Sequence, residues 1–480
     1  MKILVAGNVD EVVDPVAENK LVRKIDMYIM PFLCITYLIT YIDKATLGYA
    51  AVFDLPKDLH LHGTQYSWLS SIFYFGFLIF EYPTNFFMQK LSVSKWLAVN
   101  IFLWGGITMA QGGVNHFEPF MALRFIMGML ESCATPATIL LIGMWYKIEE
   151  QPIRIGIWAM FLGISNAFGG LLAFGIGHIQ GSFASWRYQF IIVGAVSSVW
   201  AIVVFFGLAE NAASARWLSP EQRILAVQRL RVNNTGIKNK EIKRYQIVEA
   251  LLDPKTWFFF FFGVSTQVVN GAASNFGSLI IKGFGFTTLK TTLLQIPYGF
   301  LILVANISAM YIQRWLPGQR RCIVAIVYVL VSLVGIIGVY TIPRHNHWAL
   351  LVCYWLTGTY TVSYSMALSL ITANIGGYTK RSTVTAIFFI SYCTGNIVGP
   401  FAFKPSEAPK YQSGIIAILV AYCVEIALFA LFAVYVAMMN RKKQSIFEEL
   451  GPDADNEQAR TIASFNDLTD KENVFFRYTY

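Results

Sequence analysis

Six ionisable residues lie inside long apolar stretches of the sequence, where a charge is costly, and four of them fall in pairs on two of the stretches. Asp43 and Lys44 are neighbours in the first apolar segment, and Arg124 and Glu131 are seven residues apart in the fourth. A spacing of seven places two side chains on one face of a helix, about 10 Å apart along its axis. Charges inside apolar segments of this length usually mark ion or substrate pathways. The four residues are therefore candidates for ligand binding and for proton transfer.

The two acidic and two basic groups have no net charge, so they can pair with one another when nothing is bound. An anionic ligand would compete for Lys44 and Arg124, and a guanidinium group can hold a carboxylate through two parallel hydrogen bonds. The displaced acid, Asp43 or Glu131, would then stand alone in a medium of low dielectric constant, where it tends to take up a proton. This pattern predicts that an anion and a proton bind together. The structural alternative is that the charges form ion pairs that hold helices together.

Other polar side chains accompany these charges at helical spacing. Tyr41 and Lys44 are three residues apart in the first apolar segment, and Tyr74 and Glu81 are seven apart in the second. In the second half of the chain, neutral side chains such as Asn396 can either orient a ligand or join two helices. The pattern does not decide the role of Glu81.

The composition indicates a chain that crosses a membrane many times. Of its 480 residues, 56% are hydrophobic and only 14% are charged, whereas soluble domains carry about 25% charged residues. Apolar stretches that are long enough to span a bilayer alternate with polar connections. The expected fold is an all-α membrane protein with twelve transmembrane helices in two six-helix halves. The predicted segments are residues 27–52, 66–89, 96–113, 117–146, 153–178, 186–208, 256–281, 289–313, 320–342, 346–375, 381–403 and 412–438.

The basic residues predict how the chain is oriented. They gather in alternate connections, which by the positive-inside rule face the cytoplasm together with both termini. The same rule explains the formal net charge of +9 without a nucleic-acid partner. We expect an amphipathic helix at residues 217–231 and a disordered polar tail after Lys443. The predicted organisation is a cytoplasmic N-terminal segment (1–26), an N-terminal half (27–208), a cytoplasmic central loop (209–255), a C-terminal half (256–438) and a cytoplasmic tail (439–480).

The chain contains no sequence pattern of an enzyme. Its six cysteines fall inside or at the edges of apolar segments and lack the spacing of metal ligands. Neither a nucleophile with its base nor a phosphate-binding loop is found. We therefore expect no cofactor and no metal. No role follows for Glu425, which has no obvious partner in the sequence.

Several longer motifs resemble those of a known transporter family. They are residues 41–50 (YIDKATLGYA), 81–85 (EYPTN), 124–131 (RFIMGMLE), 253–257 (DPKTW), 294–299 (LQIPYG), 374–381 (NIGGYTKR) and 395–400 (GNIVGP). Together they resemble the fungal allantoate permease family, in the anion:cation symporter branch of the major facilitator superfamily. The strongest match is the motif at residues 374–381. The chain departs from the family at Ala209, where relatives often carry a proline-containing turn.

The resemblance implies a proton-coupled importer of a small organic anion or zwitterion, such as allantoate, ureidosuccinate, a dipeptide or a vitamin carboxylate. It further implies a monomer in the plasma membrane that works by alternating access. Two other functions stay open: an exporter of drugs or metabolites from the same superfamily, and a nutrient sensor that does not transport. The implied roles are proton coupling for Asp43 and Glu131, binding of the substrate carboxylate for Lys44 and Arg124, and lining of the pocket for Tyr41, Tyr74 and Asn396.

Overall fold

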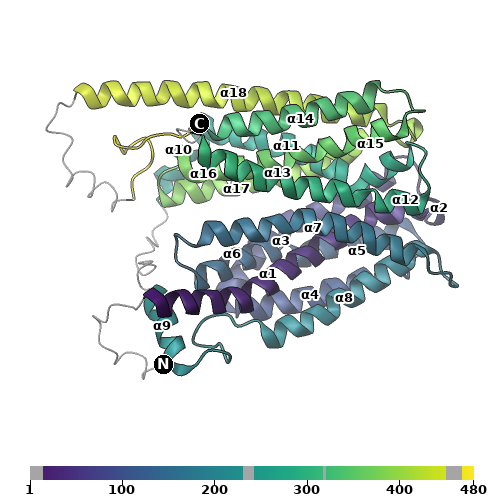
Figure 1. Cartoon of the computed structure of the whole chain (residues 1–480), viewed down its shortest axis with the longest axis horizontal. Coiled ribbons are helices and arrows are strands. Elements are labelled where there is room, and N and C mark those ends of the chain that lie inside the picture. The colour runs from purple at the N-terminus through teal and green to yellow at the C-terminus, as the bar shows by residue number, and fades with distance from the viewer. Residues whose placement is uncertain (1–14, 231–242, 317–319, 450–466) are drawn as a thin grey trace.

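The computed structural model describes residues 15–230, 243–316, 320–449 and 467–480, and the regular elements in this part of the chain are all helices. Figure 1 shows two layers of helices, one from each half of the chain. Within the described ranges, nine helical stretches are long and apolar enough to cross a membrane. The all-α membrane fold predicted from composition is confirmed.

Each layer is formed by consecutive helices. The N-terminal half contains α1 (Pro15–Val52), α2 (Leu55–Asp58), α3 (Gln65–Lys90), α4 (Val93–Gln111), α5 (Phe117–Glu131), α6 (Ala134–Trp145), α7 (Gln151–Gly177) and α8 (Ser185–Gly207). The connection between the halves contains α9 (Pro220–Leu230) and α10 (Arg244–Leu252). The C-terminal half contains α11 (Pro254–Lys282), α12 (Thr288–Leu293), α13 (Gln295–Trp315), α14 (Arg321–Thr341), α15 (His347–Leu356), η3 (Thr357–Tyr360), α16 (Thr361–Asn374), α17 (Tyr378–Val398), η4 (Gly399–Ala402), η5 (Pro405–Glu407) and α18 (Gln412–Glu449).

Three of the predicted segments are interrupted helices. The segment 117–146 is divided between α5 and α6, and the segment 346–375 is divided by the 3₁₀ turn η3. The segment 289–313 begins with the short α12 before α13. Hydropathy does not detect the break between α5 and α6 or the one between α12 and α13, because Phe117–Trp145 and Thr288–Trp315 are each apolar enough as a whole to cross a membrane. One consequence is that Glu131 is the last residue of α5 and lies beside a break.

Polar residues of α3 and α11 lie where the two halves meet. Ser67 of α3 donates a hydrogen bond to the carbonyl oxygen of Pro400 (3.0 Å), and Ser71 donates one to the carbonyl oxygen of Ile397 (2.7 Å). Neither helix is among the nine stretches that are apolar enough to cross a membrane. The low hydropathy of α3 follows from its position, because its hydroxyl groups hydrogen-bond across the interface rather than face lipid.

Hydrogen bonds hold the two halves together at one of the two ends of the bundle. We call the end that carries α9, α10 and residues 467–480 the basic end, and the end that carries α2 and α12 the opposite end (Figure 1). At the opposite end, Tyr66 donates a hydrogen bond to the carbonyl oxygen of Asn275 (2.8 Å), and Lys282 donates one to that of Val52 (2.7 Å). At the basic end, the ion pairs of the described residues each stay within one half and the connecting helix beside it. This conformation is therefore held closed at the opposite end.

The expectation of a disordered tail is wrong for residues 467–480. This segment packs against the C-terminal half, and the side chains of Thr469, Asp470 and Tyr478 are buried. The polar composition of the tail as a whole concealed an aromatic end that packs in the core of that half. The rest of the tail beyond α18, residues 450–466, lies outside the described part of the chain.

The predicted amphipathic helix forms as α9. Its basic residue Arg229 is buried and pairs with Glu18 (3.2 Å) and Glu150 (2.5 Å), which fastens α9 to the N-terminal half. Arg231, the last residue of the predicted helix, lies outside the described residues.

Candidate functional site

Two of the four predicted charges form a buried ion pair. The Nζ atom of Lys44 on α1 lies 2.8 Å from Oε1 of Glu131 on α5. Glu131 is fully buried, and the Lys44 side chain is 17% exposed. The ammonium group also lies 5.6 Å from the ring centre of Phe73 and 5.3 Å from that of Phe77, both on α3. The aromatic rings attract the cation through their faces and keep water away from the pair.

Asp43 points into a different part of the N-terminal half. Its Oδ2 atom accepts hydrogen bonds from Nε1 of Trp104 on α4 (2.9 Å) and from Oγ of Ser197 on α8 (3.0 Å). Its Oδ1 atom is buried and accepts no hydrogen bond from the described residues. Neighbouring residues on a helix point about 100° apart, so Lys44 and Asp43 face different helices. The structure does not bring Asp43 within ion-pair distance of a described basic group.

Arg124 is a buried cation with unused donors. Its side chain is 2% exposed and lies over the rings of Phe120 (6.0 Å) and Phe190 (5.8 Å). Nη1 lies 3.8 Å from the sulfur of Met127, whereas Nε and Nη2 donate no hydrogen bond to the described residues. A guanidinium group always carries its charge in proteins. Arg124 is therefore able to bind an anion through donors that this conformation leaves unsatisfied.

A polar and aromatic cavity lies between the halves. Tyr41 and Ala45 of α1 line it, so Lys44 stands next to a cavity residue on the same helix. Within the wall, Gln295 donates to Oγ of Ser278 (3.2 Å). Phenol, amide and hydroxyl groups can bind a small polar ligand, and the rings provide apolar contact. The cavity is lined by Tyr41, Ala45, Tyr49 and Asn166 from the N-terminal half, and by Ala273, Ser274, Ser278, Gln295, Tyr298, Ile302, Tyr360 and Thr361 from the C-terminal half.

Asn396 stands behind the cavity wall. It is fully buried, accepts a hydrogen bond from Nδ2 of Asn270 (2.9 Å) and donates one to Oε1 of Gln267 (2.9 Å). Asn270 in turn accepts a hydrogen bond from the hydroxyl group of Tyr360, a cavity residue (3.2 Å). Asn396 therefore fixes the orientation of a residue that touches the cavity. Its predicted direct contact with a ligand remains a prediction.

Tyr74 also lies outside the cavity lining. It is buried, with its ring 6.0 Å from that of Tyr392 on α17 and 5.1 Å from that of Phe73. These rings pack α3 against α17, one helix from each half. A movement of one half relative to the other would change this contact. Direct binding of a ligand by Tyr74 stays a prediction.

Three tyrosines of the cavity were not identified from sequence: Tyr49, Tyr298 and Tyr360. The sequence signal that could have pointed to them is the large number of tyrosines: the chain contains 24, and many of them lie in apolar segments. Glu425, which had no evident partner, accepts a hydrogen bond from Oγ1 of Thr266 in the core of the C-terminal half (2.8 Å). That contact joins α11 and α18, which are distant in sequence.

Membrane-spanning helices in two halves, with a polar cavity that both halves line, are the arrangement expected of a membrane transporter. The family profile described as the Major Facilitator Superfamily matches residues 33–400, and the chain belongs to this superfamily. It is an integral membrane protein and a secondary transporter, not an enzyme.

Several named proteins are similar over almost the whole chain. Allantoate permease of Saccharomyces cerevisiae is 35% identical over 482 residues, which cover 97% of this chain and 87% of that protein. Thiamine pathway transporter THI73 of the same yeast is 33% identical over 464 residues, covering 96% and 86%. The resemblance to the allantoate permease family is confirmed.

Solved structures agree in fold. The inward-open structure of the xylose transporter XylE from E. coli aligns with a TM-score of 0.63 over 82% of this chain and 94% of that chain. A bacterial homologue of the human lysosomal transporter Spinster aligns with a TM-score of 0.63 over 84% and 95%. At 13% and 16% identity, these structures support the fold alone.

Proposed function

We propose that this transporter imports a small organic anion or zwitterion together with protons, by alternating access, across the plasma membrane. The observation that carries the proposal is the buried pair of Lys44 and Glu131 beside a cavity residue of α1. Similarity to allantoate permease favours a small carboxylate as substrate. The phenol and amide groups of the cavity suit the neutral polar parts of such a molecule.

The substrate carboxylate competes with Glu131 for Lys44. Both carboxylates cannot share one ammonium group in a buried site without a large repulsion, so binding of the substrate frees Glu131 from its partner. Arg124 is a second cation that can bind a carboxylate as the N-terminal half rearranges. Its Nε and Nη2 donors have no hydrogen-bond partner among the described residues.

The freed Glu131 then takes up a proton. It is fully buried, and its partner Lys44 lies over the rings of Phe73 and Phe77, so a bare carboxylate would have little solvation there. Protonation makes the loaded site neutral enough to pass through an occluded state. Asp43 is a second acid in the same half, and its free Oδ1 can accept a proton without breaking the bonds from Trp104 and Ser197.

Uptake by yeast cells that lack their own permeases tests this function. We would express the chain and offer labelled allantoate, ureidosuccinate, nicotinate, pantothenate, a dipeptide and cysteine at external pH 5 and pH 7, with and without an uncoupler. One compound should accumulate at pH 5 and lose accumulation when the uncoupler collapses the gradient. A cargo whose cellular content falls on expression would identify an exporter instead. Surface-expressed protein that moves none of these compounds would count against this substrate class.

Replacing Lys44 with alanine should weaken substrate binding. The variant loses the cation that is proposed to hold the carboxylate, a loss of roughly 2–5 kcal/mol for a buried charge pair, or about 30-fold or more in KM. Arg124→Ala should act in the same direction. Lys57→Ala is the matched control, because Lys57 pairs with Asp54 (2.8 Å) at an exposed position outside the cavity. Unchanged KM in Lys44→Ala would make the residue structural.

A further inference from the structure

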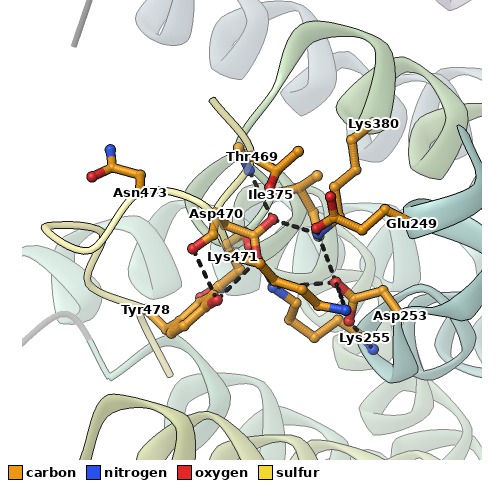
Figure 2. Close-up of polar contacts among 12 residues, drawn as sticks. Glu249, Asp253, Lys255, Ile375, Lys380, Thr469, Asp470, Lys471, Asn473 and Tyr478 are labelled. Carbon is orange, nitrogen blue, oxygen red and sulfur yellow. Dashed lines mark hydrogen bonds and ion pairs between the residues drawn. The ribbon is translucent and has the colours of Figure 1, made fainter. Parts of the chain in front are cut away.

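Residues 467–480 lie across the basic end of the C-terminal half, and Figure 2 shows the contacts at their centre. Asp470 is buried between two buried lysines: its carboxylate pairs with Lys255 of α11 and, at 2.7 Å, with Lys380 of α17. The carboxylate also accepts hydrogen bonds from the backbone N–H of Gly376 (3.2 Å) and from the hydroxyl group of Tyr478 (2.9 Å). We call the receiving surface the dock. It is formed by Lys255, Asn374, Gly376, Lys380, Asn440 and Lys443.

The dock needs a negative charge from the segment. It contains three lysines with little or no exposure, Lys255, Lys380 and Lys443, and the described acids outside the segment that pair with them are Asp253 and Glu249. One positive charge therefore lacks a partner unless Asp470 is present.

Asp470 meets this need at neutral pH. Burial alone would raise the pKa of its carboxyl group, but Lys255 and Lys380 outweigh burial and lower the pKa to about 2. The carboxylate is therefore charged at every pH at which a cell works. Because its pKa is depressed, the contribution of Asp470 to docking is present above its ordinary pKa and is lost only as the pH falls toward 2.

The dock also binds the backbone of the segment. Asn374 accepts a hydrogen bond from the N–H of Thr479 (2.8 Å) and donates one to its carbonyl oxygen (2.9 Å). Asn440 does the same with Tyr478, at 2.9 Å for both bonds. Two side-chain amides thus pair with an extended backbone as a neighbouring β-strand would, which is a common way to recognise a peptide.

The family motif at residues 374–381 builds much of this dock. It supplies Asn374 and Lys380, and at Gly376 a Cβ atom would lie only 2.6 Å from the backbone nitrogen of Asp470. The N–H of Tyr378 donates to Oδ1 of Asp467 (2.6 Å). None of these residues lines the cavity between the halves. The strongest motif of the sequence therefore serves the C-terminal segment rather than the substrate.

The docked segment also fastens the connection between the halves. Lys243, at the start of α10, donates to the carbonyl oxygen of Asp467 (2.9 Å), and Gln246 donates to the same oxygen (3.2 Å). At the other end of the connection, α9 is fixed to the N-terminal half by Arg229. Each half thus holds one end of the connection. The C-terminal half does so directly, through the pair of Lys380 with Glu249 (2.9 Å), and also through residues 467–480.

We propose that the dock is a peptide-binding site whose ligand is the chain's own C-terminal segment, and that its occupation is required for a stably packed C-terminal half. The recognised chemistry is a buried aspartate followed, eight residues later, by an extended aromatic stretch. The segment is a separable ligand, so it should stay bound when its covalent connection to α18 is cut.

Cutting that connection in the folded, detergent-purified protein tests the proposal. A recognition sequence for a site-specific protease is inserted between Glu449 and Asp467, the protein is cleaved and washed, and the retained segment is measured by mass spectrometry. We expect the parent protein to retain it and Asp470→Asn to lose it, with binding about 30-fold or more weaker. Glu472→Gln is the matched control, because Glu472 is exposed and an amide oxygen can still accept the hydrogen bond from the N–H of Thr469.

A steric variant separates shape from charge. Gly376→Ala should also release the segment and lower the melting temperature, whereas Gly106→Ala, with no heavy atom near its added methyl group, should do neither. Should the variants fail to fold, synthetic peptide 467–480 can be added to cleaved, washed parent protein, and it should rebind while the peptide carrying Asp470→Asn should not. The proposal would be overturned if the segment left the parent protein as readily as it leaves the Asp470→Asn protein. It would also be overturned if the melting temperature of the parent did not fall when the segment is washed away. These measurements need no substrate, so their outcome is independent of the proposed transport activity.

Discussion

Glu131→Gln is expected to abolish proton-driven accumulation of substrate while leaving substrate binding in place. The amide cannot take up a proton, so the step that couples the gradient to transport is lost. Lys44 loses its competing partner in this variant and remains free for the substrate carboxylate. Accumulation at external pH 5 should fall to equilibration, whereas counterflow exchange, which needs no gradient, should continue. The two assays together separate coupling from binding.

The control for this variant lies on the same helix. Glu118 is exposed near the start of α5, so Glu118→Gln changes the same chemical group without touching the buried pair. Its accumulation should equal that of the parent. If the Glu131→Gln variant still accumulates substrate in a pH-dependent way, Glu131 has no part in the coupling mechanism. If Asp43→Asn lost accumulation at the same time, coupling would be assigned to Asp43 instead.

Gly128→Ala is expected to destabilise the N-terminal half. A methyl group on Gly128 of α5 would overlap the backbone carbonyl group of Phe73 on α3, and one on Gly76 would overlap that of Phe125. The two helices therefore contact each other through their backbones, and a side chain would force them apart. Overpacking of this kind costs about 1–3 kcal/mol or more. Size-exclusion chromatography should show less monodisperse protein, and the melting temperature should fall.

The same substitution at open positions provides the comparison. Gly106 on α4 and Gly143 on α6 have no heavy atom within 4 Å of an added Cβ. Alanine favours a helix over glycine by about 1 kcal/mol, so Gly106→Ala and Gly143→Ala should be neutral or stabilising. A Gly128→Ala protein as stable as these two would show that α3 and α5 can separate without cost. Because Glu131 is three residues from Gly128, we also expect the variant to disturb the pair with Lys44.

The sequence by itself determined the membrane class, the helical content and the charges that lie inside the spanning segments. These properties follow from the lipid solvent, because each spanning segment must be apolar over about 20 residues and each exception is then conspicuous. Lys44 and Glu131 could be selected in this way without knowledge of the fold. The motifs around Asp43 and Arg124 also indicated the family, which the comparisons confirm.

Only the tertiary structure decided which groups meet. Lys44 pairs with Glu131, whereas its neighbour Asp43 binds Trp104 and Ser197, because the rotation of α1 against α4, α5 and α8 sets what each side chain faces. The docking of residues 467–480 was equally hidden. The two segments in contact, the tail and the motif at residues 374–381, are far apart in the chain. A local sequence pattern does not predict a contact between residues at such a separation. Burial of Asp470 beside Lys255 and Lys380 is favourable only when all three charges are brought together, which is a property of the packed fold.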